Sequence, residues 1–177
     1  MFKMQDVKSV NRIAIVGPPG SGKSFLADIL GKRLGLPVYH MDLHFWKPNW
    51  GETDEKEWAR EVTKQTQKPQ WIIEGGYLYD YSTIIPRFKG AELVIFLNIN
   101  ERECIDNVLR RRPQPSDWFP KFLQETEETT KYLIENVIKK YEPKRQMIYK
   151  TRDNHAKGKF IELNTREEID ELVNSLL

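Results

Sequence analysis

The stretch that decides the fold runs from Arg12 to Ser24 and reads RIAIVGPPGSGKS. Residues 12–16 are mostly β-branched or apolar and stop at a glycine, which is the pattern of a buried strand. The remainder, Gly17-Pro18-Pro19-Gly20-Ser21-Gly22-Lys23-Ser24, matches the phosphate-loop pattern G-x-x-x-x-G-K-[ST] in full. A helical pattern follows at once, so the motif stands in the strand–loop–helix context in which it binds phosphate.

The residue types of this loop indicate nucleoside triphosphate binding. Its glycines tolerate positive φ and keep side chains away, so that backbone N–H groups can converge on phosphate oxygens. Lys23 is expected to reach the β- and γ-phosphates, and the Ser24 hydroxyl to ligate Mg²⁺. We therefore predict that residues 17–24 bind ATP with Mg²⁺. A turn that only joins a strand to a helix would require neither Lys23 nor Ser24.

Outward from the loop, short apolar runs alternate with longer helical patterns. We expect strands at 12–16, 37–41, 71–73, 93–97 and 159–163, and helices at 23–34, 53–66, 101–111, 121–140, 144–149 and 166–176. This alternation predicts an α/β fold with a five-stranded parallel sheet covered by helices on both faces. No repeat or linker divides the chain, so we predict one domain, residues 1–177, with a lid insertion at about 110–143.

Composition sets wider bounds. The chain has 177 residues, 39% of them hydrophobic, and a formal charge of +2, which is too small to argue for a nucleic acid or a membrane as partner. No apolar run approaches the roughly 20 residues that span a bilayer, and no signal peptide is evident. Cys104 is the only cysteine, which excludes an internal disulfide. We expect a cytoplasmic protein.

Further candidate residues follow the predicted strands, where ligands of parallel sheets bind. Glu74 ends the third strand and is predicted to hold a water on Mg²⁺, although a carboxylate there could instead face solvent. Gly75 and Gly76, directly after it, would let an acceptor approach the backbone closely.

The loop predicted after the second strand carries an acid and several aromatic side chains. Asp42 is predicted to act on the acceptor and Trp46 to stack against it, although Trp46 could instead pack under a lid. His40 and His44 also suggest a metal site, but no second His or Cys pair supports tetrahedral zinc.

A basic segment ends the helix predicted at 101–111. Arg110 and Arg111, followed by Arg112 and Pro113, are candidates for a lid that stabilises the transferring phosphoryl group. A helix turns about 100° per residue, so the arginines cannot all face one site, and a cationic helix end is the alternative. A second basic stretch runs from Lys139 to Arg152.

Three segments together resemble the DNA-topology-modulation proteins, an adenylate-kinase-related family: residues 17–24, LPVYHMDLHFW at 36–46 and WIIEGGY at 71–77. The resemblance covers about residues 12–112 and extends weakly through 139–149. It implies a P-loop NTPase fold like that of nucleoside-monophosphate kinases, with an acceptor region and a helical lid. It also implies that Asn164 and Thr165 line the adenine of the donor, and it makes Arg145 a candidate acceptor ligand.

These patterns predict an ATP-dependent phosphotransferase of the nucleotide-kinase type, with Lys23 and Mg²⁺ on the donor and a small nucleotide or nucleoside-like acceptor. The alternative is a regulatory or DNA-associated ATP-binding protein that hydrolyses ATP slowly. The family name suggests DNA, yet the sequence contains no recognisable motif that reads nucleic acid.

Overall fold

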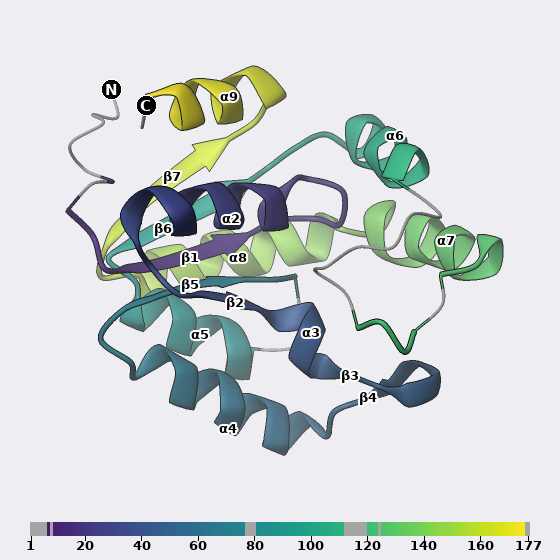
Figure 1. Ribbon diagram of the computed structural model, residues 1–177, viewed down its shortest axis with the longest axis horizontal. Helices are drawn as coiled ribbons and strands as arrows, with labels where there is room; N and C mark the ends of the chain where they lie inside the picture. Colours follow the sequence, from purple (N-terminus) through teal and green to yellow (C-terminus); the bar gives the residue numbers. More distant parts are fainter. Residues whose placement is uncertain (1–6, 8, 77–80, 112–119, 124, 176–177) are drawn as a thin grey trace.

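The centre of the molecule is a five-stranded sheet. The computed structural model describes residues 7, 9–76, 81–111, 120–123 and 125–175. The sheet has the order β2-β5-β1-β6-β7, and every pair of neighbouring strands is parallel. Its strands are β1 (Arg12–Val16), β2 (Val38–His40), β5 (Trp71–Glu74), β6 (Leu93–Leu97) and β7 (Lys159–Leu163), as Figure 1 shows. The predicted five-stranded parallel sheet is confirmed.

Helices cover both faces of this sheet (Figure 1). One face packs against α2 (Lys23–Leu34), α6 (Glu101–Arg111) and α9 (Arg166–Asn174). The other face packs against α4 (Glu55–Thr66), α5 (Tyr81–Gly90) and α8 (Glu142–His155). The prediction of helices on both faces is therefore confirmed.

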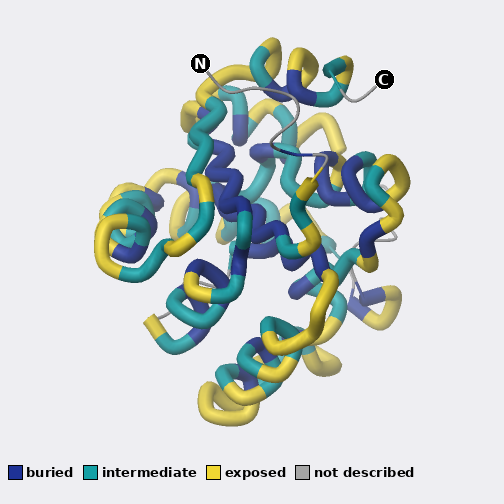
Figure 2. Tube along the Cα trace, turned by 90° about the vertical axis from the view of Figure 1, so that its left-hand side faces the viewer, coloured by how far each residue is buried: buried dark blue, intermediate teal, exposed yellow. Residues whose placement is uncertain are grey.

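The central strand shows why the sheet needs both layers. Ile13 and Ile15 belong to the core on the α2 side, Ala14 and Val16 to the core on the α5 side, and all four are 0% exposed. Alternate side chains of a strand point to opposite faces, so an apolar run of this kind is stable only between two apolar layers. In Figure 2 the buried trace accordingly runs through the middle, with exposed segments outside.

The segment after β2 differs from the predicted loop. It forms the short helix α3 (Met41–Phe45), then β3 (Trp46–Lys47), the 3₁₀ turn η1 (Pro48–Trp50) and β4 (Gly51–Glu52), with β3 and β4 antiparallel. Met41 is 0% and Phe45 2% exposed. Residues four apart lie on one side of a helix, so coiling buries both of these side chains in the core.

Other element boundaries also differ from the predictions. The helix predicted at 121–140 consists of α7 (Glu127–Leu133), which Thr126 caps, and the π-helical turn η2 (Ile134–Ile138). The helix predicted at 144–149 is part of a longer helix, α8, which begins at Glu142 and ends at His155. No helix was predicted at α5, which buries Ile84 and Phe88.

The predicted lid is described only in part, since 112–119 and 124 lie outside the described residues, and with them the candidate Arg112 and Pro113. Within the described part of the chain, no helix is long and apolar enough to cross a membrane.

Gly158, the residue directly before β7, packs closely against the backbone at the start of β6, and this contact can be tested by mutation. A Cβ on Gly158 would lie 2.3 Å from the carbonyl oxygen of Glu92, the backbone group that accepts from Lys159 N at 2.9 Å. Gly158→Ala should therefore lower the free energy of unfolding by about 1–3 kcal/mol, as overpacking does. Urea unfolding measures it.

Gly90→Ala is the matched control, because the nearest atoms to its Cβ would be at 3.4 Å and the residue lies in α5. It should change the free energy of unfolding by less than about 1 kcal/mol. Equal losses in the two variants would contradict the role assigned to Gly158.

Candidate nucleotide and acceptor site

The phosphate loop lies between β1 and α2 and packs against α6. Gly20 has φ 81°, and a Cβ on it would lie 2.3 Å from the carbonyl oxygen of Cys104. Asn107 Nδ2 donates to the carbonyl oxygen of Gly20 at 3.0 Å. Ser21 is only 3% exposed, and its N–H donates to the carbonyl of Pro18. The loop is thus fixed both by its own turn and by the helix beneath it.

Lys23 begins α2 and lies among charged groups from several elements. Its Nζ donates to the carbonyl oxygen of Pro18 at 2.9 Å. Burial lowers the pKa of Lys23, the carboxylates of Glu74 and Asp42 oppose that change, and Arg111 adds to it. Four predicted site residues, Lys23 on α2, Asp42 on α3, Glu74 at the end of β5 and Arg111 at the end of α6, therefore share one electrostatic neighbourhood.

Ser24 and Glu74 are in direct contact. Ser24 Oγ donates to Glu74 Oε1 at 3.0 Å, and Glu74, the last residue of β5, is 2% exposed. Mg²⁺ takes oxygen ligands at 2.0–2.1 Å in an octahedron, in which adjacent oxygens are about 3 Å apart. A hydroxyl and a carboxylate at this separation fit Mg²⁺, either directly or through a bound water.

His40 completes the surroundings of Glu74. Its Nδ1 lies 2.8 Å from Glu74 Oε1, and its Nε2 lies 3.1 Å from Asp28 Oδ1 on α2. Burial alone would lower the pKa of His40, but the hydrogen bond and charge of Glu74, together with Asp28, raise it. The two carboxylates therefore favour the charged imidazole.

His44 has different surroundings. It stacks on Tyr39, with ring centroids 4.2 Å apart, and burial lowers its pKa, an effect that the charge of Glu61 opposes. The two imidazoles thus contact different partners. Among the described residues, no group of three or more His, Cys, Asp or Glu side chains could hold a metal ion.

Arg87 is a buried charge that sequence reasoning missed. It is 0% exposed on α5, its Nη1 donates to the carbonyl oxygen of Gly75 at 3.0 Å and lies 3.3 Å from Met41 Sδ, and its Nε donates to the carbonyl of Thr83. Burial lowers the pKa of Arg87 to about 10, so the guanidinium stays charged at neutral pH. An arginine in a surface helix is usually solvated, so the sequence carried no signal for this contact.

The remaining acceptor candidates surround the same edge of the sheet. A Cβ on Gly76 would lie 3.7 Å from the carbonyl oxygen of Gly17, which places the Gly75–Gly76 pair beside the phosphate loop. Asp42 lies in α3. Trp46 is half-buried and packs edge-to-face against Phe45 and Trp50, at centroid distances of 5.0 and 5.4 Å. Stacking of Trp46 on an acceptor remains a prediction.

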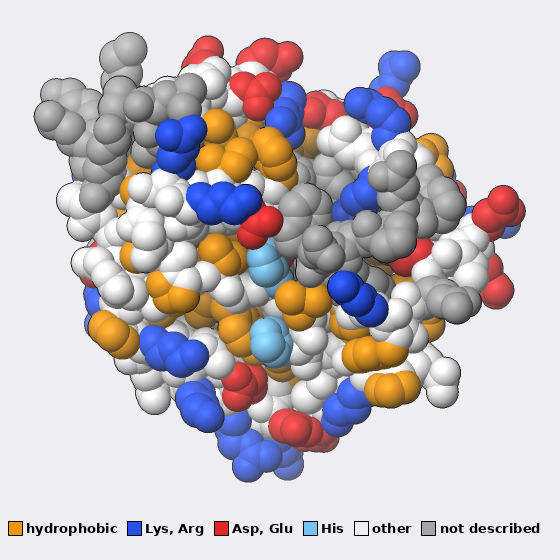
Figure 3. Space-filling view, viewed as in Figure 1, with side chains coloured by type: hydrophobic (Ala, Val, Ile, Leu, Met, Phe, Trp, Pro, Cys, Tyr) orange, Lys and Arg blue, Asp and Glu red, His pale blue; other side chains and the backbone are white. Residues whose placement is uncertain are grey.

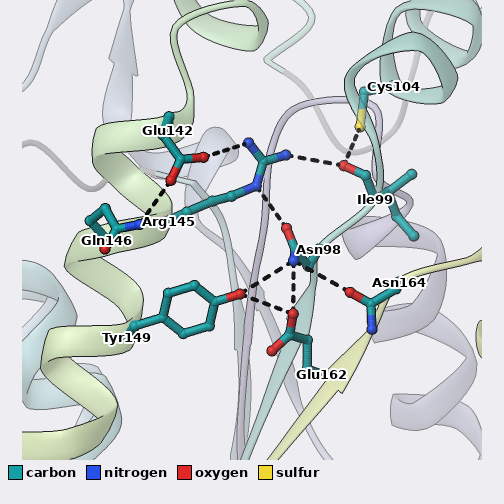
Figure 4. Close-up of polar contacts among 9 residues, drawn as sticks. All are labelled: Asn98, Ile99, Cys104, Glu142, Arg145, Gln146, Tyr149, Glu162 and Asn164. Carbon is teal, nitrogen blue, oxygen red and sulfur yellow. Dashed lines mark hydrogen bonds and ion pairs between the residues drawn. The ribbon is translucent and has the colours of Figure 1, made fainter.

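Arg145 belongs to a polar network at the ends of β6 and β7 (Figure 4). Its Nε donates to Asn98 Oδ1 at 2.7 Å, and its other nitrogens contact Glu142 and the carbonyl of Ile99 at 3.4 Å. Asn98 Nδ2 in turn donates to Glu162 Oε1 at 2.7 Å and to Asn164 Oδ1 at 3.4 Å.

This network ties α8 to both strand ends. Next to Asn164, Thr165 caps α9 by accepting from the N–H of Glu168 at 3.2 Å. Adenine contacts of Asn164 and Thr165, and an acceptor contact of Arg145, remain predictions.

The arginines at the end of α6 are placed differently from one another. Both Arg110 and Arg111 are exposed. Arg111 continues the stripe of Cys104 and Val108, the buried side chains of α6, and it acts electrostatically on Lys23. Arg110 is turned by about 100° from that stripe.

Comparison with known proteins gives a fold but no family. A scan against protein-family models and a search of curated proteins found no match. The structure is similar to shikimate kinase from Bacteroides thetaiotaomicron, with a TM-score of 0.62 and 18% identity over 95% of this chain and 97% of that one. It is also similar to shikimate kinase from Acinetobacter baumannii in complex with shikimate (TM-score 0.57, 18% identity, 98% and 95% covered).

A gluconokinase from Sinorhizobium meliloti 1021 is similar as well, with a TM-score of 0.54 and 15% identity over 94% of this chain and 89% of that one. The chain therefore has the α/β fold of nucleoside-monophosphate-kinase-like P-loop proteins. The resemblance to DNA-topology-modulation proteins remains a prediction.

The two imidazoles should titrate on opposite sides of the ordinary histidine pKa of about 6.5. NMR titration without metal should place the pKa of His40 above that value and the pKa of His44 below it. Asp28→Ala should lower the pKa of His40 and change that of His44 less, because Asp28 contacts His40 whereas only the charge of His40 acts on His44. A raised folded-state pKa also means that the contribution of His40 to stability is complete below about pH 6.5 and is lost as the pH rises through the folded-state pKa. Coincident titration of His40 and His44 would contradict this assignment.

Proposed function

We propose that the protein is an ATP-dependent phosphotransferase that transfers the γ-phosphoryl group of ATP to a small acceptor. The observation that carries this proposal is that α3, directly after β2, brings Asp42 to the end of the sheet where Glu74 contacts Ser24 of the phosphate loop, so that the charges of Asp42 and Glu74 both act on Lys23. A phosphate loop that only binds nucleotide needs the lysine and a metal ligand. An additional carboxylate from α3, the helix that follows β2, suits a group that orients an acceptor hydroxyl.

The similar structures support transfer to a small molecule. Two are named as shikimate kinase and one as a gluconokinase, and the likeness extends over nearly the whole of this chain. Membership in the adenylate-kinase-related DNA-topology-modulation family is proposed on the resemblance of residues 36–46 and 71–77 alone. We infer an acceptor of nucleotide or nucleoside-like character.

In this proposal each residue has a defined task. Backbone N–H groups of residues 17–24 bind the phosphates, and Lys23 binds the β- and γ-oxygens. Ser24 and Glu74 would hold Mg²⁺, which supplies charge neutralisation when bound. Asp42 accepts a hydrogen bond from the acceptor hydroxyl and orients it toward the γ-phosphorus. Positioning and fixed charge then provide most of the acceleration.

The distribution of charge agrees with small anionic ligands. On the face drawn in Figure 3, lysine and arginine side chains lie among acidic ones over much of the described surface and gather along the lower edge of the view. The formal charge of the whole chain is only +2, which gives no argument of its own for a nucleic-acid partner. The phosphates of a bound donor account for Lys23 at the loop.

The proposed function is tested by ADP release in the presence of candidate acceptors: nucleoside monophosphates, nucleosides, shikimate, gluconate and other hydroxylated metabolites. One acceptor class should raise ADP release well above basal hydrolysis. Lys23→Ala should weaken ATP binding roughly 10- to 100-fold, as expected for loss of a hydrogen bond to a charged group. Lys32→Ala, an exposed lysine of the same helix, is the control. ATP affinity that is unchanged in Lys23→Ala would overturn the proposal, and stimulation only by a macromolecule would favour the regulatory alternative.

Arg111 is the arginine expected to act on the transferring phosphoryl group. A guanidinium that stabilises charge in the transition state is worth about 10³-fold or more in turnover. Arg111→Ala should therefore depress acceptor-dependent turnover far more than ATP affinity, and Arg111→Lys should restore little, because a point charge lacks the planar fork. Steady-state turnover and ATP dissociation constants provide the two readouts.

The first-turn arginine of α6, Arg102, is the control for Arg111 and should tolerate alanine without loss of turnover. Arg110→Ala should have a smaller effect than Arg111→Ala. If Arg110→Ala is the more damaging change, the assignment of Arg111 is wrong.

A further inference from the structure

The carboxylate of Glu74 is held from two sides. Its Oε1 accepts from Ser24 Oγ at 3.0 Å and lies 2.8 Å from His40 Nδ1. With 2% exposure, Glu74 has little water to compensate its charge, so these two contacts determine how the carboxylate is oriented. Ser24 is a proposed metal ligand in its own right, which leaves His40 as the side chain that contacts Glu74 through Nδ1 without being proposed as a metal ligand itself.

His40 is itself fixed by the fold. It lies opposite Glu74 in the register of β2 and β5, so the two side chains meet at the same edge of the sheet. Its other nitrogen, Nε2, lies 3.1 Å from Asp28 Oδ1. Asp28 follows Ser24 by about one turn of α2, so both side chains project from one side of that helix. Ser24, Glu74, His40 and Asp28 therefore close a ring of contacts between α2, β5 and β2.

We propose that His40 is a positioning residue for the magnesium site, acting through Glu74. A carboxylate only accepts hydrogen bonds, so each ring nitrogen of His40 serves as a donor, one to Glu74 and one to Asp28. Asp28 sets the orientation of the ring, and the ring sets the orientation of Glu74. This inference rests on the proposed function, because it assumes that Glu74 holds Mg²⁺ or its water.

The expected magnitude follows from comparable sites. Loss of a residue that orients a metal ligand typically lowers metal affinity 10- to 100-fold. Nucleotide phosphates bind mainly to the loop and Lys23, so removal of His40 should leave metal-free nucleotide binding unchanged. A role of His40 in packing alone would depend on the volume of the ring and not on which nitrogen is kept.

Two substitutions separate these roles. In His40→Asn the amide nitrogen takes a position close to that of Nδ1 and can donate to Glu74. In His40→Gln the amide nitrogen reaches toward the position of Nε2 and can donate to Asp28 instead. Mn²⁺, which prefers the same oxygen ligands as Mg²⁺, serves as the probe in the presence of ADP, and the paramagnetic signal of free Mn²⁺ gives its affinity.

We expect His40→Asn to keep most of the Mn²⁺ affinity and His40→Gln to lose it about 10- to 100-fold. Asp28→Ala should give an intermediate loss of Mn²⁺ affinity, because it removes only the partly exposed partner of Nε2 and leaves the ring in place. This variant still tests the proposal if either His40 variant fails to fold. His44→Gln should bind Mn²⁺ like the wild type, because His44 stacks on Tyr39.

Two outcomes overturn the inference alone: wild-type Mn²⁺ affinity in both His40→Gln and Asp28→Ala, or equal losses in His40→Asn and His40→Gln. ADP binding in EDTA is measured for every protein and distinguishes this failure from failure of the proposed function. A wild-type protein that binds no ADP would overturn both.

Discussion

Strand β1 is paired in parallel with β5 on one side and β6 on the other, and this pairing fixes where every site residue lies. All five strands of this sheet point the same way, so the phosphate loop, His40 and Glu74 lie at one end of it. Ile15 lies opposite Glu74, and Glu74 lies opposite His40. A slip of one residue would turn each side chain to the other face and break the contacts of Glu74 with both Ser24 and His40.

The same edge holds two buried charges, Glu74 and Arg87. Removing a charge from water is costly unless polar neighbours compensate it. Glu74 is compensated by a hydroxyl and an imidazole. The carbonyls of Thr83 and Gly75 accept from Nε and Nη1 of Arg87, whereas its buried Nη2 has no hydrogen-bond partner among the described residues. Arg87 donates to the carbonyl oxygen of Gly75, the residue directly after Glu74, so the two buried charges lie close together where β5 ends. Fixed charges of this kind are what phosphoryl transfer uses, since they need no rearrangement when the reaction occurs.

The sequence predicted the parts of this structure that depend on local pattern. The strand, loop and helix from Arg12 to Leu34 and the strands β6 and β7 have the predicted limits. Features that depend on pairing between distant segments were not predictable: His40 contacts Glu74 only because β2 lies beside β5, and Arg87 is buried only because α5 packs under Gly75. The helix α3 was missed because the core contacts of Met41 and Phe45, not local propensity, make this segment coil.

The aromatic cluster after α3 has an optical consequence. The indoles of Trp46 and Trp50 lie 5.4 Å apart at 76°, and the ring of Trp58 lies 5.3 Å from that of Phe45. Chromophores this close and this firmly oriented share their electronic excitation, and the resulting circular dichroism depends steeply on their separation and angle. The segment that carries Asp42 is thus accompanied by its own spectroscopic signature. The circular dichroism of its tryptophans therefore reports on the packing of this segment separately from that of the sheet.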